Sequence, residues 1–427
     1  MQDNKKKPAL RFKGFTDPWE QRKLGEICDF ITKGATPTTY GFSWQPDGVP
    51  FFRNDSIKDN VFVLGEFSYI SEAANEVLKR SEVHGNDILI AITGDIGKVG
   101  IIPDTVEKAN INQHIARVRI RKEALPYFVY QYLASDDTQK EYQKIKTGLS
   151  MPQLSLEQVR DIVVKIPEFN EQGKIADCLR RIDTFITLHQ RKYEKLVNIK
   201  KSMLDKMFPQ NGASVPEIRF KGFTDPWEQR KLDEAFDFTV PNNTLSRAEL
   251  NQESGSVRNV HYGDVLIKYG SVLDAQNDEL PFITGRSKDD FKGALLQNGD
   301  IIIADTAEDE TTGKVCEIVN IQDKDVVAGL HTMVCRPKNK TAEGYFGYYM
   351  NSSSYHHQLL PLMQGIKVLS LSKTNVQKTT VKYPKDKAEQ QKIADCLRRI
   401  DTLITLHQRK LEKLQNIKKS CLEKMFV

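Results

Sequence analysis

The chain has 427 residues, of which 39% are hydrophobic, 9% aromatic and 28% charged, and this is the composition of an ordinary folded protein. At roughly 150 residues per domain the length predicts two or three domains, and the composition excludes collagen-like and wholly disordered chains. No apolar stretch approaches the roughly 20 residues of a membrane-spanning helix. The basic first residues lead into no apolar signal region. We therefore expect a cytoplasmic protein without membrane segments.

The chain is an internal repeat. Residues 11–24 read RFKGFTDPWEQRKL and recur unchanged at 219–232, and residues 171–208 recur at 389–426 with 32 of 38 positions identical. The regions between these copies are related only weakly. This plan predicts two variable domains, each flanked by near-constant segments. The predicted parts are an N-terminal arm with a first variable domain at 1–170, a central helix at 171–210, a second arm with a second variable domain at 211–388, and a C-terminal helix at 389–427.

The repeated helical segments have the 3.5-residue apolar period of a coiled coil. At 1.5 Å per residue such a helix is a rod of roughly 50 Å, which needs a partner. Because both copies lie in one chain, we expect them to pack antiparallel, with the variable domains at opposite ends and related by a pseudo-twofold axis. Lys200 and Lys418 fall at seam positions and are expected to set the register. The predicted apolar seam residues are Ile175, Leu179, Ile182, Ile186, Leu196, Ile393, Leu397, Ile400, Ile404, Leu411 and Leu414.

Each variable domain is predicted to be α+β. Short β-branched and aliphatic runs separated by Gly, Asn, Asp and Pro predict strands, and helical stretches follow at residues 127–144 and 345–363. The expected strands are residues 61–64, 87–92, 99–102, 116–120, 265–267, 300–304, 315–318 and 332–335.

Charge is distributed unevenly along the chain, whose formal net charge is +5. Each repeated helical segment has nine basic and five acidic residues, whereas residues 25–167 have 16 basic and 19 acidic ones and residues 233–384 have 15 and 20. A non-specific polyanion binder would show the opposite distribution, so any DNA contact of the variable domains must use small local clusters. The basic helix residues are either a solvated face or a phosphate-facing one.

Catalytic motifs are missing from the sequence. The Gly-Lys pairs do not continue to Ser or Thr as in a phosphate-binding loop, and neither H-E-x-x-H nor G-x-S-x-G occurs. The Asn/Asp-Pro-Pro-aromatic motif of amino-methyltransferases is also absent, and the six cysteines contain no C-x-x-C pair. By elimination, the chain is predicted to bind without catalysing and to hold no metal.

The duplicated KGFTDPWEQRKL arms, the duplicated EQ-x-KIADCLRRID helices and the run NDILIAITG together resemble the specificity subunit of type I restriction-modification enzymes. The resemblance covers essentially the whole chain. It implies two target-recognition domains that each read half of a bipartite double-stranded DNA sequence, across a spacer set by the paired helices. It also implies a non-catalytic subunit that assembles with two methyltransferase subunits and with endonuclease-translocase subunits. S-adenosylmethionine, ATP and Mg²⁺ would be bound by those partners and not by this chain.

The resemblance indicates DNA-contacting residues in the first domain. Residues 33–37, KGATP, resemble the family's Gly-x-Thr-Pro loop, although Ala35 stands where a second glycine is common. Arg suits guanine and Asn suits adenine in the major groove. Arg53 is predicted to read a base unless it pairs with Asp55 on the surface. The predicted contacts are Lys33, Thr36, Arg53 and Asn54, with Lys146, Thr147 and Ser150 as phosphate contacts.

The second domain lacks the Gly-x-Thr-Pro loop, so its candidates come from other polar segments. Divergence between the two domains predicts an asymmetric, non-palindromic target. Two other functions stay open from the residues alone, a stand-alone DNA-binding protein and a coiled-coil adaptor between two proteins. The second-domain candidates are Asn243, Ser246, Arg247, Arg258 and Lys367.

Overall fold

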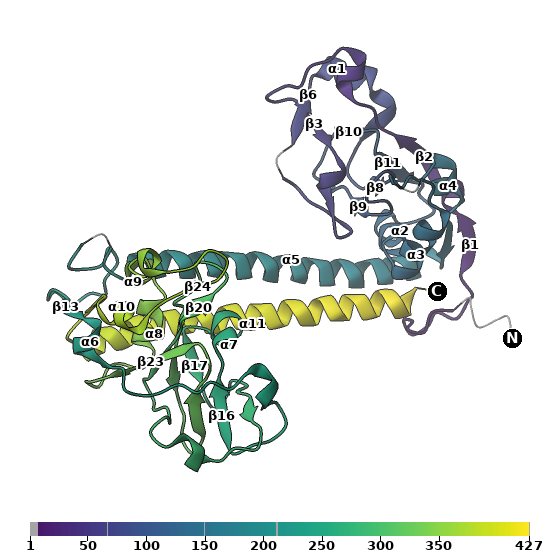
Figure 1. Cartoon of the computed structure of the whole chain (residues 1–427). Helices are drawn as coiled ribbons and strands as arrows, with labels where there is room; N and C mark the ends of the chain where they lie inside the picture. The colour runs from purple at the N-terminus through teal and green to yellow at the C-terminus, as the bar shows by residue number, and fades with distance from the viewer. Residues whose placement is uncertain (1–6, 66, 149, 211, 427) are drawn as a thin grey trace. The chain divides into compact units, whose positions relative to one another are not determined.

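Two structural units make up the chain. The computed structural model describes residues 7–65, 67–148, 150–210 and 212–426. Unit 1 comprises Met1–Gln190 and Arg409–Val427, and unit 2 comprises Arg191–Gln408. The boundary falls inside the two longest helices, α5 (Phe169–Lys206) and α11 (Lys387–Met425), which are labelled in Figure 1. Each unit therefore contains a part of both long helices.

Unit 1 is α+β (Figure 1), with four-stranded sheets in the orders β6-β3-β10-β7 and β2-β11-β8-β9 and two-stranded sheets β1-β12 and β4-β5. Strand β3 pairs with β10 in parallel, and the other pairs of the four-stranded sheets are antiparallel. The strands are β1 (Glu20–Lys23), β2 (Cys28–Lys33), β3 (Val49–Phe52), β4 (Ile57–Lys58), β5 (Val61–Phe62), β6 (Ser68–Ile70), β7 (Glu82–Val83), β8 (Ile88–Ala91), β9 (Val99–Ile101), β10 (Ala109–Ile111), β11 (Ile115–Ile120) and β12 (Val163–Ile166). The helices are α1 (Glu72–Val77), α2 (Pro126–Leu133), α3 (Asp136–Ile145) and α4 (Leu156–Asp161), with 3-10 turns η2 (Leu24–Glu26), η3 (Pro37–Tyr40), η4 (Asn54–Ser56) and η5 (Lys79–Ser81).

Unit 2 has a five-stranded sheet β14-β23-β19-β21-β17, a four-stranded sheet β15-β18-β16-β22, and two-stranded sheets β13-β25 and β20-β24. The strands are β13 (Glu228–Lys231), β14 (Phe236–Asp237), β15 (Leu250–Asn251), β16 (Val257–Val260), β17 (Val272–Asp274), β18 (Phe282–Ile283), β19 (Ile301–Ala304), β20 (Thr306–Ala307), β21 (Val315–Val319), β22 (Asp325–Ala328), β23 (Thr332–Pro337), β24 (Leu369–Ser370) and β25 (Thr380–Tyr383). The helices are α6 (Leu232–Ala235), α7 (Tyr262–Ile267), α8 (Tyr345–Met350), α9 (Ser353–His356) and α10 (Lys373–Gln377), with η6 (Arg247–Glu249), η7 (Lys288–Phe291) and η8 (Leu360–Leu362).

Each unit has an equivalent central strand, β8 in unit 1 and β19 in unit 2, and each strand is preceded by an equivalent ion pair. All four residues of β8 and all four of β19 are buried, as expected for apolar runs in the middle of a sheet. The residue before each strand is a buried aspartate. Asp87 makes two 2.7 Å hydrogen bonds with Arg119 of β11, and Asp300 bonds Arg336 of β23 at 2.8 and 2.7 Å. One scaffold therefore underlies both variable regions.

Seven of the eight expected strands are confirmed. Residues 265–267 are the exception, because they lie in α7. The His261 side chain accepts the backbone N–H of Gly263 at 3.1 Å and so caps this helix, while Val265 enters the core. A short apolar run does not by itself distinguish a strand from a buried helix. The predicted helical stretches also break, at Ser135 before α3 and at Ser352 before α9.

The identical arms attach to the start of each long helix by a buried ion pair. In unit 1, the Arg11 guanidinium donates two hydrogen bonds of 2.7 Å to Glu171. In unit 2, Arg219 bonds Glu389 at 2.7 and 2.9 Å. Both carboxylates are almost fully buried, so each arm neutralises a charge that the fold would otherwise bury alone.

Each unit also holds the end of a long helix by aromatic contacts. Phe426, after α11, has its ring centroid 5.5 Å from those of Phe128 and Tyr132 and 6.3 Å from that of Trp19. These side chains belong to one core with Ile175 of α5.

The same arrangement recurs in unit 2 at the end of α5. Phe208 lies 5.4 Å from Tyr349, 5.9 Å from Tyr345 and 6.4 Å from Trp227. Phe208 is fully buried. The apolar and aromatic residues that follow each helix therefore form part of a domain core.

The two long helices run antiparallel within each unit. In unit 1, Ile175 and Leu179 share a core with Met425, and Lys418 pairs with Asp183 at 2.7 Å. In unit 2, Lys200 pairs with Asp401 at 2.6 Å. No helix of the described residues is long and apolar enough to cross a membrane. Of the predicted seam residues, Ile175, Leu179, Ile393, Leu397 and Ile400 are buried, and Ile182, Ile186, Leu196, Ile404, Leu411 and Leu414 are half-buried.

Glu317 of β21 makes the stability of unit 2 depend on pH. Burial raises the pKa of this carboxyl to about 7, although it accepts backbone N–H groups of Gly344 and Gly347 at 2.6 and 2.9 Å. The folded state holds the proton more tightly than the unfolded chain does. The contribution of this group to the stability of the fold is therefore complete below its ordinary pKa of 4.5 and is lost as the pH rises through 7. We expect the free energy of unfolding of unit 2 to fall by about 3 kcal/mol between pH 5 and pH 8, and we expect Glu317→Gln to abolish this fall.

Amide hydrogen exchange of β21 and α8 at pH 5 and pH 8, corrected for intrinsic rates, measures this effect. Glu253→Gln is the matched control, because Glu253 is exposed in the same unit and is not among the groups that shift the pKa of Glu317. An identical pH dependence in Glu317→Gln and the unmodified chain would refute the assignment.

Candidate nucleic-acid interface

The candidate interface of unit 1 lies where β3 and β8 end. Asn54 follows β3, and its Nδ2 donates to the carbonyl of Thr93, which follows β8, at 2.9 Å. Gln153 forms isolated β-bridges with both Thr93 and Thr147. The structure therefore brings together two predicted contacts, Asn54 and Thr147, that are far apart in the sequence.

The Asn54 side chain is only partly satisfied. Its Oδ1 is buried with no hydrogen-bond partner among the described residues, which costs about 1–3 kcal/mol. A two-bond contact with adenine uses the amide oxygen and the amide nitrogen together. Neither atom is open to a base in this conformation, because Oδ1 is buried and Nδ2 donates to the Thr93 carbonyl, so contact with adenine requires the Asn54 side chain to turn outward.

Arg53 is exposed and is oriented by stacking. Its guanidinium carbon lies 4.8 Å from the ring centroid of Trp44, and Nη2 donates to Ser68 at 2.9 Å. The surface pair with Asp55 that the sequence left open is not formed. Stacking fixes the plane of the guanidinium while leaving donors available, which suits recognition of a guanine edge.

The loop resembling Gly-x-Thr-Pro packs tightly against β10. A Cβ atom on Gly34 would stand 1.9 Å from the carbonyl oxygen of Ile111, so this position requires glycine. Thr36 precedes η3 and donates from Oγ1 to Gln113 at 2.5 Å. Lys33, at the end of β2, is exposed. The loop thus lies beside the residues that follow β10.

Gln113 and His114 are polar residues at this edge that the sequence reading missed. Gln113 Nε2 lies 3.1 Å from His114 Nε2, and the carbonyl of His114 accepts the N–H of Ile92. The signal was weak, since only the parallel pairing of β3 with β10 places these residues beside Arg53 and Asn54.

The predicted phosphate contacts form an exposed turn after α3. Lys146 donates to Gln143 at 2.9 Å, and Thr147 donates from Oγ1 to the Gln153 carbonyl at 3.3 Å. Ser150 is exposed. Three exposed polar residues on one turn are compatible with a phosphate contact.

Three of the predicted contacts of unit 2 are engaged within the fold. Arg247 makes a two-bond ion pair with Asp264 at 2.5 and 2.9 Å. Asn243 donates to Asn259 and to the Ala328 carbonyl, both at 2.8 Å. Ser246 precedes η6, and both its N–H and its hydroxyl donate to Glu249. These side chains hold the loop around η6 in place.

The other two predicted contacts of unit 2 differ in environment. The Arg258 guanidinium carbon lies 4.3 Å from the Phe282 ring centroid, and its Nη1 donates to a carbonyl at 3.4 Å. Lys367 is exposed in a turn beside Ile366, whose side chain is fully exposed. Lys367 is therefore the more accessible of the two.

The structural counterpart of Arg53–Asn54 in unit 2 is His261–Tyr262, which follows β16. Strand β16 pairs in parallel with β22 as β3 does with β10. Tyr262 packs edge-on against His331 at 5.3 Å, and His331 lies 3.4 Å from Asp305. Burial lowers the pKa of His261, and Arg247 lowers it further. From the sequence we predicted Arg258 instead, because the correspondence of His261–Tyr262 with Arg53–Asn54 follows from strand pairing and not from spacing along the chain.

The family model of the type I restriction modification DNA specificity domain matches this chain twice, over residues 16–198 and 224–416. The chain belongs to this family. Each match contains one variable domain and most of one long helix, and we call the globular parts of units 1 and 2 recognition domains 1 and 2.

Relatives of this specificity chain carry consistent names. The type I restriction enzyme EcoBI specificity subunit of Escherichia coli is 27% identical over 192 residues, which are 43% of this chain and 40% of that protein. The MjaVIII specificity subunit of Methanocaldococcus jannaschii is 23% identical over 94% of this chain and 91% of that one. A crystal structure of the S subunit of the M. genitalium type I restriction-modification system has the same fold, with a TM-score of 0.63, 16% identity and 99% of both chains covered.

Family membership supports the specificity-subunit interpretation over a stand-alone DNA-binding protein or an adaptor. Specificity subunits recognise DNA, and catalysis in these enzymes is carried out by other subunits. No group of three His, Cys, Asp or Glu residues suited to a metal ion occurs in the described parts of the chain.

Recognition domain 1 is fastened to the paired helices through Asp183 of α5. This carboxylate accepts hydrogen bonds from the Tyr127 hydroxyl at 2.6 Å and from Gln131 Nε2 at 2.8 Å, both from α2. Lys418 of α11 pairs with the same carboxylate at 2.7 Å. One side chain therefore joins the domain, its own helix and the antiparallel helix.

Recognition domain 2 repeats this junction through Asp401 of α11. The Tyr348 hydroxyl donates to Asp401 at 2.8 Å, and Lys200 of α5 pairs with it at 2.6 Å. The seam lysines thus find their partners beside the domains, which supports the predicted role in register.

Proposed function

We propose that each recognition domain reads one half of a bipartite, asymmetric DNA target through the residues at its strand ends. The observation that carries this proposal is the contrast between Arg53–Asn54 and His261–Tyr262, which occupy equivalent places on a shared scaffold but differ in chemistry. In domain 1 the proposed base contacts are Arg53 and Asn54, with Lys33, Thr36, Lys146, Thr147 and Ser150 around them. In domain 2, His261, Tyr262, Arg258 and Lys367 face DNA, and Asn243, Ser246 and Arg247 support the adjoining loop.

The paired helices set the distance between the two half-sites. Helices of 38 and 39 residues correspond to rods of roughly 55–60 Å, and adjacent major grooves on one face of B-DNA recur every 34–36 Å or so. The Lys200–Asp401 and Lys418–Asp183 pairs oppose sliding of one helix along the other.

Two methyltransferase subunits and the endonuclease-translocase subunits supply the chemistry, and they bind the S-adenosylmethionine, ATP and Mg²⁺. Apolar side chains on the long helices support docking of such subunits. Phe185 and Leu188 of α5 are 52% and 44% exposed, and the equivalent Leu403 and Leu406 of α11 are 43% and 44% exposed. Net-acidic recognition domains also favour partners that contribute phosphate contacts.

Co-purification of the tagged chain with its native partners, followed by genome-wide mapping of methylated adenines with and without the chain, tests this function. We expect a two-part asymmetric motif that disappears when the chain is removed. Unchanged methylation, with no methyltransferase recovered, would refute the proposal.

Arg53→Ala is expected to relax recognition at one base of one half-site. A two-bond arginine contact contributes about 1–3 kcal/mol of discrimination, which is roughly tenfold or more in methylation preference. Arg121→Ala is the control, because Arg121 is exposed, pairs with Asp29, and follows the end of β11 that lies away from the candidate interface. Equal loss at both half-sites would indicate a structural role for Arg53.

A further inference from the structure

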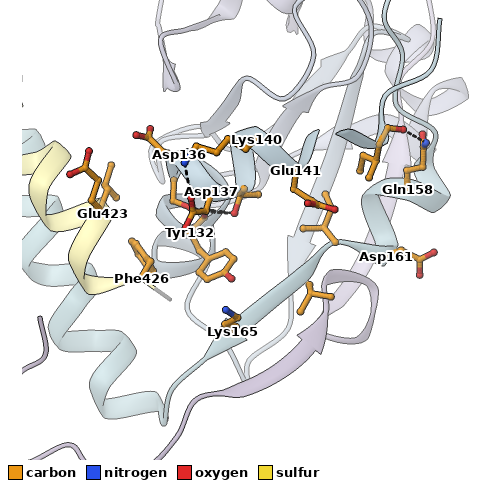
Figure 2. Close-up of a pocket in the computed structure, with 16 residues that line it drawn as sticks. Tyr132, Asp136, Asp137, Lys140, Glu141, Gln158, Asp161, Lys165, Glu423 and Phe426 are labelled. Atoms are coloured by element: carbon orange, nitrogen blue, oxygen red, sulfur yellow. Dashed lines mark hydrogen bonds and ion pairs between the residues drawn. The ribbon is translucent and has the colours of Figure 1, made fainter. Parts of the chain in front are cut away.

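An acidic groove lies between recognition domain 1 and the end of α11, within unit 1 (Figure 2). Its volume is about 930 Å³, and α3, α4, β12 and the last turn of α11 line it. Figure 2 shows Glu423 of α11 and Phe426, which follows that helix, on one side of the groove, and Gln158 and Asp161 on the other. The charged lining residues are Asp136, Asp137, Glu141, Asp161 and Glu423, with Lys140 and Lys165.

The corresponding region of unit 2 is identified by matching hydrogen bonds. Ser135 donates from Oγ to the Tyr132 carbonyl at 2.7 Å, and Ser352 donates to the Tyr349 carbonyl at 2.6 Å. Each of these tyrosines packs against the phenylalanine that ends a long helix. Asp136 and Asp137 in unit 1 therefore correspond to Ser353 and Ser354 in unit 2.

In unit 2 the chain itself occupies this region. The segment after α5 is held by its carbonyl groups, since Ser354 Oγ donates to Pro209 and Lys382 Nζ donates to Ala213 at 3.0 Å. Lys382 of β25 corresponds to Lys165 of β12, because the two lysines pair with equivalent arm residues. The groove of unit 1 is thus the counterpart of a region that binds a segment of the chain through its carbonyl groups.

The chain enters both sites at the same point. The N–H of Ile218 donates to the Lys206 carbonyl near the end of α5 at 2.8 Å, and the N–H of Leu10 donates to the Lys424 carbonyl near the end of α11 at 2.7 Å. Counted back from the identical arms, residues 1–9, MQDNKKKPA, align in sequence with residues 209–217, PQNGASVPE. Glutamine and proline coincide in the two segments.

The chemistry of groove and segment differs in a matched way. Hydroxyl donors in unit 2 are replaced by carboxylates in unit 1, which accept hydrogen bonds and attract cations. In the segment, Ala213, Ser214 and Val215 of unit 2 correspond to three consecutive lysines, residues 5–7. The groove is therefore more acidic in unit 1 than the equivalent region of unit 2, and the aligned segment is more basic, while Lys165 stands where unit 2 has Lys382.

We propose that the acidic groove of unit 1 binds the chain's own basic N-terminal segment, with Lys5 and Lys6 against its carboxylates. Three of these carboxylates already have exposed lysine partners, in the pairs Asp137–Lys140, Glu141–Lys144 and Asp161–Lys23. Exposed pairs are weak and exchange readily. Bound there, the segment covers the end of α11 and holds it on recognition domain 1.

Carbodiimide coupling of the full-length chain at low salt, read by peptide mass spectrometry, tests the placement. We expect amide links from Lys5 or Lys6 to Asp136, Asp137, Glu141 or Glu423. Exposed Lys13 of the same arm is the internal control and is expected to give no link to these residues. Links from Lys5 and Lys6 to carboxylates elsewhere would overturn the proposal.

Amide exchange of residues 422–426 provides a second readout. We expect severalfold faster exchange in Lys5→Glu/Lys6→Glu than in Lys13→Glu/Lys122→Glu, which makes the same charge change at exposed sites, and partial reversal on adding Asp136→Lys. Equal exchange in both double variants would overturn the proposal. Protection that appears only when a partner subunit is added would also overturn it, because the groove would then bind a basic segment of that partner.

Discussion

Phe208→Ala is expected to destabilise recognition domain 2 by about 3–5 kcal/mol, the cost of deleting a buried phenylalanine side chain from a packed core. Phe208 is fully buried among Trp227, Tyr345 and Tyr349, and it connects α5 to that domain. Its removal leaves a cavity where the helix end is fastened. Recognition of the domain 2 half-site is therefore expected to fail, with a corresponding loss of adenine methylation at the complete target.

The measurement is amide exchange of β25 and α8, compared with β12 and α2 of the other domain. Val197→Ala is the matched control, since Val197 lies on α5 in the same unit and is 39% exposed. We expect local opening of domain 2 alone in Phe208→Ala and no change in the control. Uniform destabilisation of both domains would contradict local anchoring by Phe208.

Asp183→Ala is expected to destabilise the junction of recognition domain 1 by about 3–5 kcal/mol, because it leaves three donors without their acceptor. The side chains of Tyr127 and Lys418 lose this partner, and so does the Gln131 amide, which is fully buried. With the domain loosened and the helix register unpinned, we expect methylation at targets whose half-site spacing differs by one base pair from the normal one.

Sequencing of methylated adenines in cells that carry each variant measures this spacing. Asp177→Ala is the control, since Asp177 is exposed on the same helix. A lowered methylation level at an unchanged spacing would show that Asp183 contributes stability only. Altered spacing in the Asp177→Ala control would show that the effect is not specific to the junction.

The sequence alone determined the repeat plan, the α+β class of the variable domains and the family. These inferences depend on local patterns, since a 3.5-residue apolar period specifies a helix seam and duplicated segments must fold alike. The buried strands β8 and β19 were also predictable from a local pattern, because each is a short apolar run. The assignment of residues 265–267 to a strand failed because the cap from His261, and not apolar content, decides that helix.

Only the tertiary structure decided which polar side chains are engaged by other parts of the fold. Arg247 and Arg53 are both arginines in loops, yet Arg247 makes a two-bond ion pair with Asp264, whereas Arg53 stacks on Trp44 and donates one hydrogen bond to Ser68. Such partners come from segments far apart in the chain, and hydrogen-bond partners depend on three-dimensional contact and not on spacing. For the same reason, the groove of unit 1 could be proposed as a binding site only after comparison with unit 2, where Ser354 and Lys382 bind the carbonyl groups of Pro209 and Ala213.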